Sequence, residues 1–467
     1  MPISPSAPEP RKTAAQALPT PTGSSFDASA AAERFSPTGS PQESRRGFLR
    51  QGTAALVGGA IAGSLSSARF AHAAGDETIK VGLIGCGGRG SGAAINALGA
   101  DKNVKLTAMA DMFEDQLQNS RRNIKNQAEA AEMGEKFAVT DDHCFTGFDA
   151  YQKVMESDVD VVLLCSPPHF RPQHLEAAIA ANKHVFCEKP VAVDGPGVRR
   201  VLETVRQAKE KNLAIVSGLC WRYDLGVRET VNRIKDGAIG DMVAIHTNYL
   251  AGTLWHRGRK PEWSEMEYQL RNWLYFTWLS GDHICEQHVH SLDKAVWLMN
   301  DELPARCFGL GGRQVRVEEP WGNIYDHHAV CYEYPNGLKV FAYTRQMGNC
   351  WNEVEDFVYG TQGTAKLLDH SITGKENWKY SGPLPSMYDV EHQELFAGLR
   401  AGKIINNGVY MAHSTLVAIM GRMACYTGEL IESSKALNSM EDLTPPHYAL
   451  GEVKVPEVPM PGRTRFL

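Results

Sequence analysis

Residues 78–90 read TIKVGLIGCGGRG, and this stretch decides the fold of the first part of the chain. The β-rich run 78–84 predicts a strand, the glycines follow at once, and residues 93–98 begin a helix. In a strand–G-x-G-x-x-G–helix unit, Gly85 forms the tight turn, Gly87 lets the backbone approach a pyrophosphate, and Gly90 brings helix and strand into contact. The stretch therefore predicts a dinucleotide-binding loop made of Gly85, Gly87, Gly88, Arg89 and Gly90. A glycine-rich turn without a ligand is the alternative.

The next predicted strand, residues 104–110, ends in Asp111, about 20 residues after the glycine loop. A carboxylate at that point accepts hydrogen bonds from the ribose hydroxyls of the adenosine and repels a 2′-phosphate. The sequence therefore favours NAD over NADP as the cofactor. Arg121 and Arg122 follow further along the chain and keep NADP as an alternative.

The alternation of strands and helices continues to about residue 220. Runs 160–165, 184–187 and 214–218 read as buried strands, and 173–181 and 202–211 as helices. The strands end in Ser166-Pro167-Pro168-His169 and in Glu188-Lys189-Pro190. Ligands bind at the carboxyl edge of an open α/β sheet, so the further predicted cofactor contacts are Ser166, Pro167, His169, Glu188 and Lys189.

Composition excludes several classes of protein. At 467 residues the chain is long enough for two domains, and a formal net charge of -6 gives no footprint for nucleic acid. Outside the N-terminal region there is no apolar run of membrane-spanning length, so we expect no stable membrane span. The ten cysteines are scattered without a C-x-x-C pair, which favours reduced, buried thiols over a disulfide framework.

The N-terminal segment is predicted to be an export address. The first 43 residues are rich in Ser, Pro, Ala and Thr and read as disordered. Residues 44–50, SRRGFLR, precede a weakly apolar run, 53–65, and an Ala-x-Ala cleavage signal at 71–73. This pattern predicts a leader with a twin-arginine signal over residues 1–75, and a periplasmic or cell-envelope protein. A chance Arg-Arg pair before an amphipathic helix is the alternative.

A second stretch rich in chemistry is Ser280–Asp293, SGDHICEQHVHSLD. If it forms one helix, Asp282, Glu286, His290 and Asp293 share a stripe that borders an apolar stripe. That is where side chains lining a cleft would lie; histidines that only pack are the alternative. The candidate metal ligands in this stretch are His283, Glu286, His288 and His290. Only Glu286 and His290 share a helical face, and no H-E-x-x-H motif is present, so no metal site is predicted.

The remaining sequence predicts a second, α+β domain over residues 221–385. A strand at 242–249 precedes an aromatic-rich segment, 251–280, and four more strand-like runs follow, two of them joined by an Asn336-Gly337 hairpin turn. Interleaved Trp, Arg and His in the aromatic segment suit a polar sugar pocket, and a plain packed insertion is the alternative. Residues 386–467 should add helices, near 390–401 and 411–427, and a tail that packs back on the domains. Candidate substrate contacts are Trp221, Arg222, Tyr223, His256 and Asp293.

These motifs together resemble the glucose–fructose oxidoreductase / inositol dehydrogenase / rhizopine catabolism (Gfo/Idh/MocA) family. The resemblance rests on the glycine loop, the acidic end of the second strand, Pro-Pro-His, Glu-Lys-Pro and a later helix with acid-x-x-x-His-x-x-Asp. It covers residues from about 79 to about 428. It implies a Rossmann dinucleotide-binding domain, residues 76–220, followed by an α+β domain with an open, mostly antiparallel sheet that serves in homo-oligomer contacts.

The resemblance also implies the catalytic residues. Lys189 of Glu-Lys-Pro and His290 of the later helix would converge on the substrate carbon that faces the nicotinamide. Many family members have Asp four residues before this His, and here that residue is Glu286. Asp293 would orient the imidazole or the domain junction.

Three functions are compatible with this sequence. The first is an NAD(P)-dependent oxidoreductase that transfers hydride between a secondary alcohol of a sugar or sugar derivative and the nicotinamide. The second is a redox-neutral, NAD-dependent glycoside hydrolase that retains its cofactor. The third is a non-catalytic protein that holds NAD and a sugar.

Overall fold

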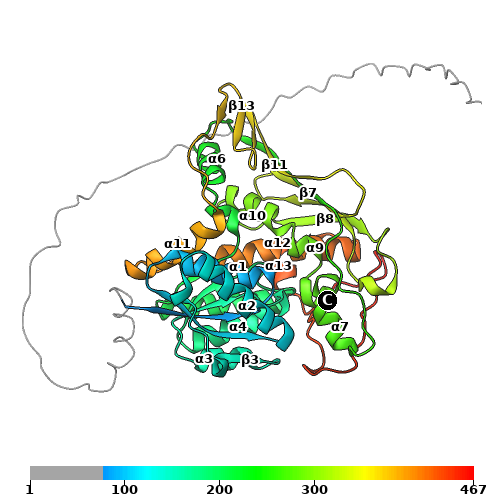
Figure 1. Cartoon of the computed structure of the whole chain (residues 1–467). Coiled ribbons are helices and arrows are strands. Elements are labelled where there is room, and N and C mark those ends of the chain that lie inside the picture. The colour runs from blue at the N-terminus through cyan, green and yellow to red at the C-terminus, as the bar shows by residue number, and fades with distance from the viewer. Residues whose placement is uncertain (1–76) are drawn as a thin grey trace, which may run out of the picture. The chain divides into compact units, whose positions relative to one another are not determined.

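The computed structural model describes residues 77–467 (Figure 1). The predicted twin-arginine signal lies outside these residues. The described part holds two sheets, one of six strands and one of nine, with helices packed on both. No helix among residues 77–467 is both long and apolar enough to cross a membrane. All ten cysteines lie in this part of the chain, and none of them forms a disulfide.

The first sheet is parallel and carries the glycine loop. Its strand order is β3-β2-β1-β4-β5-β6, so the order reverses between β1 and β4. A ligand cleft is expected at the carboxyl ends of the strands at that point. The strands are β1 (Ile79–Ile84), β2 (Val104–Asp111), β3 (Cys144–Thr146), β4 (Val161–Leu164), β5 (His184–Cys187) and β6 (Ile215–Ser217).

Helices cover both faces of this sheet, as the predicted alternation requires. Five α-helices belong to it: α1 (Gly88–Ala100), α2 (Glu114–Ala130), α3 (Ala150–Glu156), α4 (Arg171–Ala180) and α5 (Gly195–Glu210). The short 3-10 helices are η2 (Gly134–Lys136), η3 (Asp141–His143), η4 (Pro168–Phe170), η5 (Cys220–Tyr223), η6 (Trp273–Tyr275) and η7 (Glu319–Trp321). The Rossmann prediction for the first domain is thereby confirmed.

The second sheet is mostly antiparallel, which confirms the predicted fold class. Its order is β14-β13-β12-β11-β7-β10-β9-β8-β15, and only β7 and β10 pair in parallel. The predicted turn at Asn336-Gly337 joins β9 to β10, and Gly337 adopts a φ of 88°. The strands are β7 (Met242–Ala251), β8 (Arg306–Gly312), β9 (His327–Glu333), β10 (Lys339–Gln346), β11 (Glu353–Gly360), β12 (Gly363–Lys366), β13 (Ser371–Gly374), β14 (Trp378–Lys379) and β15 (Ile431–Glu432).

The remaining α-helices of residues 77–467 are α6 (Leu225–Lys235), α7 (Glu265–Arg271), α8 (Thr277–Ser280), α9 (His283–Glu286), α10 (Val289–Leu298), α11 (Met387–Arg400), α12 (Gly408–Thr427) and α13 (Ser433–Leu437). Helix α12 lies between the two sheets, because it contacts α5 of the first domain as well as α10 and β8 of the second. Every residue of α12 from Ser414 to Thr427 is buried. Helix α11, in orange in Figure 1, packs against α1 and η5.

The prediction of a single helix over Ser280–Asp293 is wrong. The chain forms α8, turns at Gly281 and Asp282, forms one turn of α9, and starts again as α10. Gly281 and Asp282 both have a φ of 76°. With a ψ of 163°, Asp282 lies in a backbone region that favours glycine, and any other residue adopts this conformation at a cost of about 1–3 kcal/mol. The predicted polar stripe is therefore split: Asp282 points into the second domain, and only Glu286 and His290 remain near the first.

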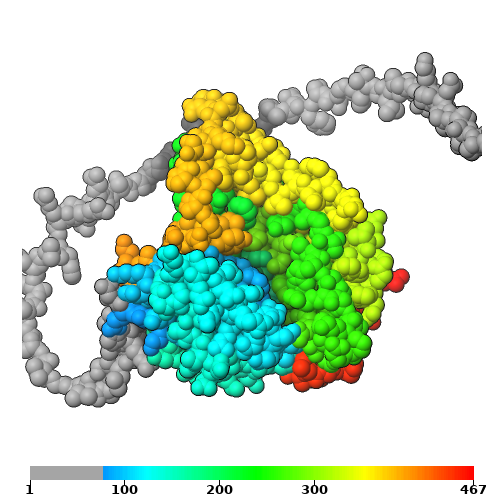
Figure 2. Space-filling view, viewed as in Figure 1, coloured from blue at the N-terminus to red at the C-terminus, as the bar shows by residue number. Residues whose placement is uncertain are grey.

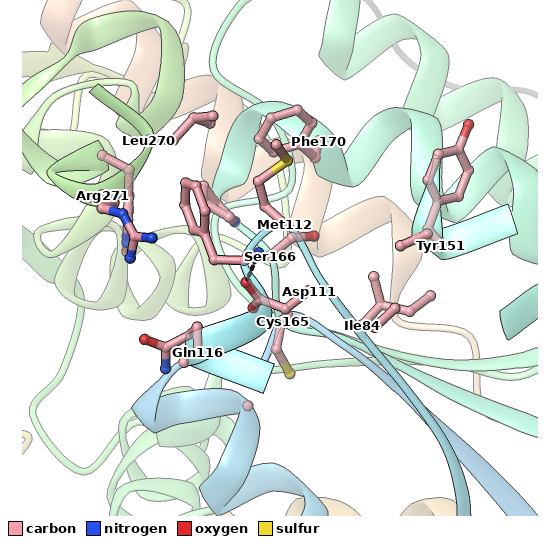
Figure 3. A pocket seen from close by; sticks show the side chains of 18 of the residues that line it. Ile84, Asp111, Met112, Gln116, Tyr151, Cys165, Ser166, Phe170, Leu270 and Arg271 are labelled. Atoms are coloured by element: carbon pink, nitrogen blue, oxygen red, sulfur yellow. Dashed lines mark hydrogen bonds between the residues drawn. The ribbon is translucent and has the colours of Figure 1, made fainter. Parts of the chain in front are cut away.

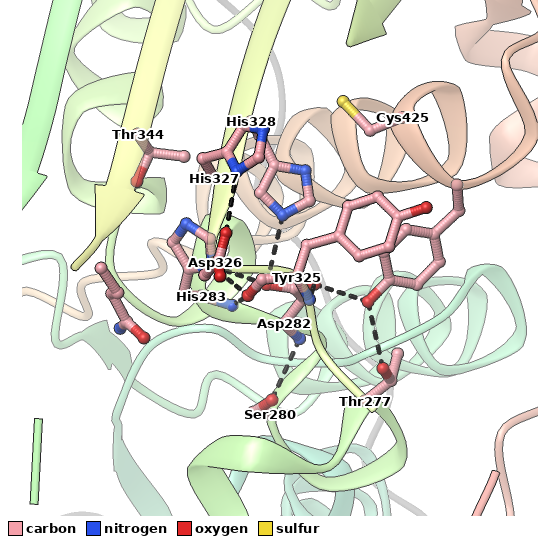
Figure 4. Close-up of polar contacts among 12 residues, drawn as sticks. Thr277, Ser280, Asp282, His283, Tyr325, Asp326, His327, His328, Thr344 and Cys425 are labelled. Atoms are coloured by element: carbon pink, nitrogen blue, oxygen red, sulfur yellow. Dashed lines mark hydrogen bonds and ion pairs between the residues drawn. The ribbon is translucent and has the colours of Figure 1, made fainter. Parts of the chain in front are cut away.

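Hydrogen bonds to a buried carboxylate hold Asp282 in this conformation (Figure 4). Its Oδ2 accepts from the backbone N of Tyr325 at 2.9 Å and from the Tyr426 hydroxyl at 2.5 Å. Its Oδ1 lies 2.8 Å from His283 Nδ1 and 3.3 Å from His328 Nε2. Burial opposes the charge, but the two imidazoles hold the pKa of Asp282 well below its ordinary value. The contacts thus come from β9 and its preceding loop, α9 and α12.

Candidate active site

A cavity of about 360 Å³ opens at the carboxyl ends of β1, β2 and β4 (Figure 3). Figure 2 shows the surface hollowed where the cyan first domain meets the green residues of the second. Eight of the predicted cofactor residues line this cavity: Gly85, Gly87, Gly88, Arg89, Gly90, Asp111, Ser166 and Pro167. Glu188, Lys189 and His169 are not among its lining residues.

The glycine loop has the geometry of a phosphate cradle. Gly85 has a φ of 96°, and a Cβ on Gly90 would lie 1.9 Å from the Gly85 carbonyl oxygen, so neither position accepts a side chain. A Cβ on Gly87 or Gly88 would meet nothing within 4 Å. No side chain caps the start of α1 at Gly88, which leaves its first amides for a ligand. These features fit the pyrophosphate of a dinucleotide.

Asp111 is tied to the glycine loop by its own side chain. Its Oδ2 accepts from the backbone N of Cys86 at 2.7 Å, and its Oδ1 accepts from the backbone N of Phe113 at 2.9 Å. Burial raises the pKa of Asp111. Because a carboxylate has about four lone-pair positions, both oxygens still have room for the ribose hydroxyls.

Arg89 connects the glycine loop to two distant glutamates. Its Nε pairs with Glu188 Oε1, and its Nη2 lies 2.6 Å from Glu391 Oε1 on α11. Its guanidinium also lies 4.7 Å from the ring centroid of Tyr388. Burial and the nearby charge of Glu188 raise the pKa of Glu391 well above its ordinary value. Sequence reasoning missed Glu391, because nothing in its local pattern places it beside a loop 302 residues earlier.

Lys189, Glu286 and His290 come together beside this loop. Lys189 follows β5, and its Nζ donates to Glu286 Oε1 at 2.9 Å and to the Glu286 backbone oxygen at 2.5 Å. The side chains of this pair are 14% and 15% exposed, so they are reachable from solvent without being freely hydrated. Burial, together with the positive charge of Lys189, lowers the pKa of the half-buried His290 well below its ordinary value. His290 is therefore a neutral imidazole at neutral pH.

The Pro-Pro-His turn places its two polar residues differently. Ser166 lines the cavity, and its Oγ lies 2.9 Å from His174 Nδ1. His169 does not line the cavity: its Nε2 lies 2.7 Å from the Tyr448 hydroxyl, and its ring edge is against Trp278. His169 therefore contacts the C-terminal tail.

The five predicted substrate contacts all have neighbours within the protein. Arg222 and Asp293 form a buried ion pair with N···O distances of 2.8 to 3.0 Å, so the charge of each side chain is paired within the protein. The Tyr223 hydroxyl donates to Asn407 at 2.7 Å. Both ring nitrogens of His256 are engaged, since Nε2 donates to the Pro320 oxygen at 2.9 Å and Nδ1 accepts from Gly258 at 3.0 Å. Trp221 packs near the Lys294 ammonium, 5.1 Å from its ring centroid.

Asp282, His283 and His328 bring three potential metal-ligand atoms within 4.8 Å of one another. Both carboxylate oxygens of Asp282 already receive hydrogen bonds. The Arg316 guanidinium, which donates to Tyr325 O at 2.6 Å, adds a positive charge that interacts with Asp282. Burial lowers the pKa of His283 to about 4. The cluster therefore reads as a hydrogen-bonded support for the chain reversal.

Comparison with known proteins agrees with this geometry. Residues 79–217 match the GFO_IDH_MocA family model, described as an oxidoreductase family with an NAD-binding Rossmann fold. This part of the chain is therefore similar to the NAD-binding domain of the Gfo/Idh/MocA oxidoreductases. The match covers all six strands of the first sheet and the loops of that sheet that line the cavity.

Sequence relatives of this chain carry different activities in their names. Inositol 2-dehydrogenase of Salmonella typhimurium (strain LT2) is 25% identical over 340 residues, which are 70% of this chain and 87% of the relative. The 2,7-anhydro-N-acetylneuraminate hydratase of Escherichia coli (strain K12) is 27% identical over 211 residues, 45% of this chain. The match spans 51% of that relative.

Solved structures share the fold over both domains. A levoglucosan dehydrogenase in complex with NADH and levoglucosan superposes with a TM-score of 0.60 at 16% identity, over 76% of this chain and 100% of the other. The aldose-aldose oxidoreductase from Caulobacter crescentus, complexed with glycerol, gives a TM-score of 0.58 at 16% identity over the same shares. At these identities the likeness shows the fold alone.

Substitution of the loop glycines separates cofactor binding from folding. Gly87→Ala should fold normally yet bind NAD about 10-fold or more weakly, because its Cβ lies where the pyrophosphate approaches. Gly90→Ala should lower the melting temperature, because its Cβ would overlap the Gly85 carbonyl. Gly99→Ala, on the same helix with no neighbour within 4 Å, is the control. Thermal unfolding and NADH titration measure both effects; equal NADH affinity in all three variants would contradict this placement.

Proposed function

We propose that this protein oxidises a secondary alcohol of a sugar or sugar derivative with NAD as the hydride acceptor. The observation that carries the proposal is the meeting of Lys189 from the first domain with Glu286 and His290 from the second, beside the glycine loop. Such an arrangement supplies a cation and a neutral base to one substrate oxygen. When bound, NAD accepts hydride at its nicotinamide ring.

In this proposal each side chain has one task. The neutral imidazole of His290 accepts the hydroxyl proton, since only an unprotonated base can do so. The Lys189 ammonium hydrogen-bonds the same oxygen and stabilises the negative charge that develops on it. Glu286 holds the amine through its carboxylate and its backbone oxygen, so the ammonium has one donor left for the substrate.

The presence of Glu286, where many family members have Asp, fits this arrangement. The break between α9 and α10 turns the backbone oxygen of Glu286 toward Lys189, and the longer side chain curls to reach the same amine. Both acceptors of the lysine therefore come from one residue. This residue holds the amine in place and does not itself touch the reacting carbon in our proposal.

The substrate class is proposed from the relatives. Inositol, levoglucosan and aldoses, which appear in the names of related proteins, are all polyhydroxylated rings or chains. A secondary alcohol flanked by further hydroxyls is the feature they share. We therefore propose a polyol or sugar as the substrate and name neither the particular sugar nor the hydroxyl that is oxidised.

Redox-neutral chemistry on a sugar derivative is a second candidate. The observation that favours it is the hydratase among the relatives, because addition of water involves no net oxidation. In such a reaction NAD would be reduced and reoxidised within one turnover, so glycoside cleavage would proceed without added cofactor. Screening polyols and aryl glycosides with and without NAD distinguishes the two functions: a dehydrogenase forms NADH in proportion to product.

Replacement of His290 and of Lys189 tests the main proposal. Lys189→Met and His290→Asn should each lower kcat about 100-fold or more while NADH still binds, because a general base and a donor that stabilises a developing oxyanion each contribute in that range. Since the pKa of His290 is lowered from 6.5, the rate should stay high below pH 6.5 and fall only as the imidazole becomes protonated. Steady-state rates from pH 4.5 to 8 measure both expectations.

The matched control is Lys209→Met on the exposed face of α5, which should leave kcat unchanged. Full activity in the Lys189→Met variant would contradict the assignment and favour the reading of a non-catalytic protein that holds NAD and a sugar.

We propose that the protein is exported by the twin-arginine route to the periplasm or cell envelope. The proposal rests on the sequence of residues 44–73 and on ten thiols that remain free in a folded chain, as suits a protein folded before export. A fusion of residues 1–75 to a folded reporter should reach the periplasm, and Arg45→Lys with Arg46→Lys should retain it inside. Arg34→Lys is the control, and equal export of all three fusions would contradict the proposal.

We also propose a homo-oligomer built on the open face of the nine-stranded sheet. Phe308 and Phe341 both pair with Cys331, and Leu310 and Tyr343 both pair with Ala329, so these exposed apolar side chains form two level rows. Light scattering should give a mass above that of one chain, and Leu310→Asp should reduce it to one. Leu384→Asp, exposed outside the sheet, should not. A monomeric wild type would refute the proposal.

A further inference from the structure

One wall of the cofactor cavity comes from the second domain. We call residues 252–275, between β7 and α8, the wall segment. Five of its residues line the cavity across from the glycine loop: Trp255, Arg257, Leu270, Arg271 and Trp273. In Figure 3, Leu270 and Arg271 lie on the ribbon of the second domain and face Asp111 and Met112. The aromatic segment expected from the sequence to bind sugar thus borders the dinucleotide site.

The wall segment is attached to the first domain beside Asp111. Both terminal nitrogens of Arg271 lie 3.1 Å from the carboxylate oxygens of Asp115, and its Nε lies 2.8 Å from Glu267. The same guanidinium sits 3.9 Å from the ring centroid of Phe113. The hydrogen bond from Arg271 holds the pKa of Asp115 below its ordinary value. Asp115 and Phe113 belong to the start of α2, directly after the acidic strand end.

The C-terminal tail supports the wall segment from behind. The backbone N of Met266 donates to the Gly451 oxygen at 3.0 Å, and the backbone N of Gly451 donates to Ser264 Oγ at 3.1 Å. Leu443 and Val453 of the tail pack on the same apolar cluster, which also holds Leu270 and Phe113. The wall segment cannot swing away from the cavity without breaking these contacts.

The chemistry of this wall matches the adenosine half of the dinucleotide. It lies next to Asp111, the group placed for the ribose hydroxyls, and it offers Trp255 and Trp273 to a flat aromatic base. The charge of Arg271 is neutralised by Asp115 and Glu267, so this arginine adds no net attraction for a 2′-phosphate. Adenine therefore suits the wall, with its ribose beside Asp111.

We propose that the wall segment encloses the adenosine of NAD, and that the Arg271–Asp115 contact keeps the cofactor bound through many turnovers. Release of NAD then requires this contact to open first. The proposal depends on NAD binding and on nothing about the substrate, so it can fail while the proposed alcohol oxidation stands.

Release of NADH in the absence of sugar tests the enclosure. Purified full-length protein is loaded with NADH and mixed with a large excess of NAD, and the loss of bound NADH fluorescence gives the release rate. Arg271→Ala should release NADH about 10-fold faster or more, because it loses a two-pronged ion pair and a cation–π contact. Arg271→Lys, which keeps the charge but not the fork, should lie between the two.

The control is Arg121→Ala, which removes an exposed ion pair with Asp141 elsewhere on α2 and should leave the release rate within about twofold of wild type. Asp115→Asn breaks the same ion pair by changing its exposed acidic partner. The result therefore does not depend on whether Arg271→Ala folds normally. Equal release rates in wild type, Asp115→Asn and Arg121→Ala would overturn the proposal. Faster release in both Arg271→Ala and Asp115→Asn with unchanged thermal unfolding would establish it.

Discussion

The buried carboxylate of Asp282 is the constraint on which the active-site geometry depends. It accepts hydrogen bonds from two elements distant in the sequence and holds a backbone conformation that is unfavourable for a residue with a side chain. That conformation ends α8 and aims the short helix α9 so that Glu286 meets Lys189. A carboxylate that takes no part in the chemistry thus positions the residues that do.

The same constraint shows what the sequence could and could not predict. Five of the six strands of the first sheet lie within about two residues of their predicted bounds, because buried parallel strands and a glycine loop obey rules that act over a few neighbours. The short strand β3 has no counterpart in the sequence prediction. Eight predicted cofactor residues line the cavity for the same reason. The helix predicted for Ser280–Asp293 failed because its interruption depends on Tyr325 and Tyr426, which no local pattern connects to it.

The ion pair of Arg222 and Asp293 was not predictable for a related reason. A polar residue in an otherwise apolar stripe indicates a partner, but it does not say whether that partner is a ligand or another part of the chain. Here each is the partner of the other, in the core between η5 and α10. His256 likewise has both nitrogens engaged by backbone groups nearby. Glu391, by contrast, gave no signal at all, because its role depends on how α11 packs on α1.

The hydrogen bond between Gly451 and Ser264 joins residues 187 positions apart, and this has a consequence for the order of folding. Contacts that close such long loops carry a larger entropic cost and form after local ones. The strands and helices around the glycine loop are near neighbours in sequence, so the phosphate cradle can be complete while the adenosine side is still open. The part of the cavity wall next to Asp111 therefore depends on contacts of much longer range than the glycine loop itself does.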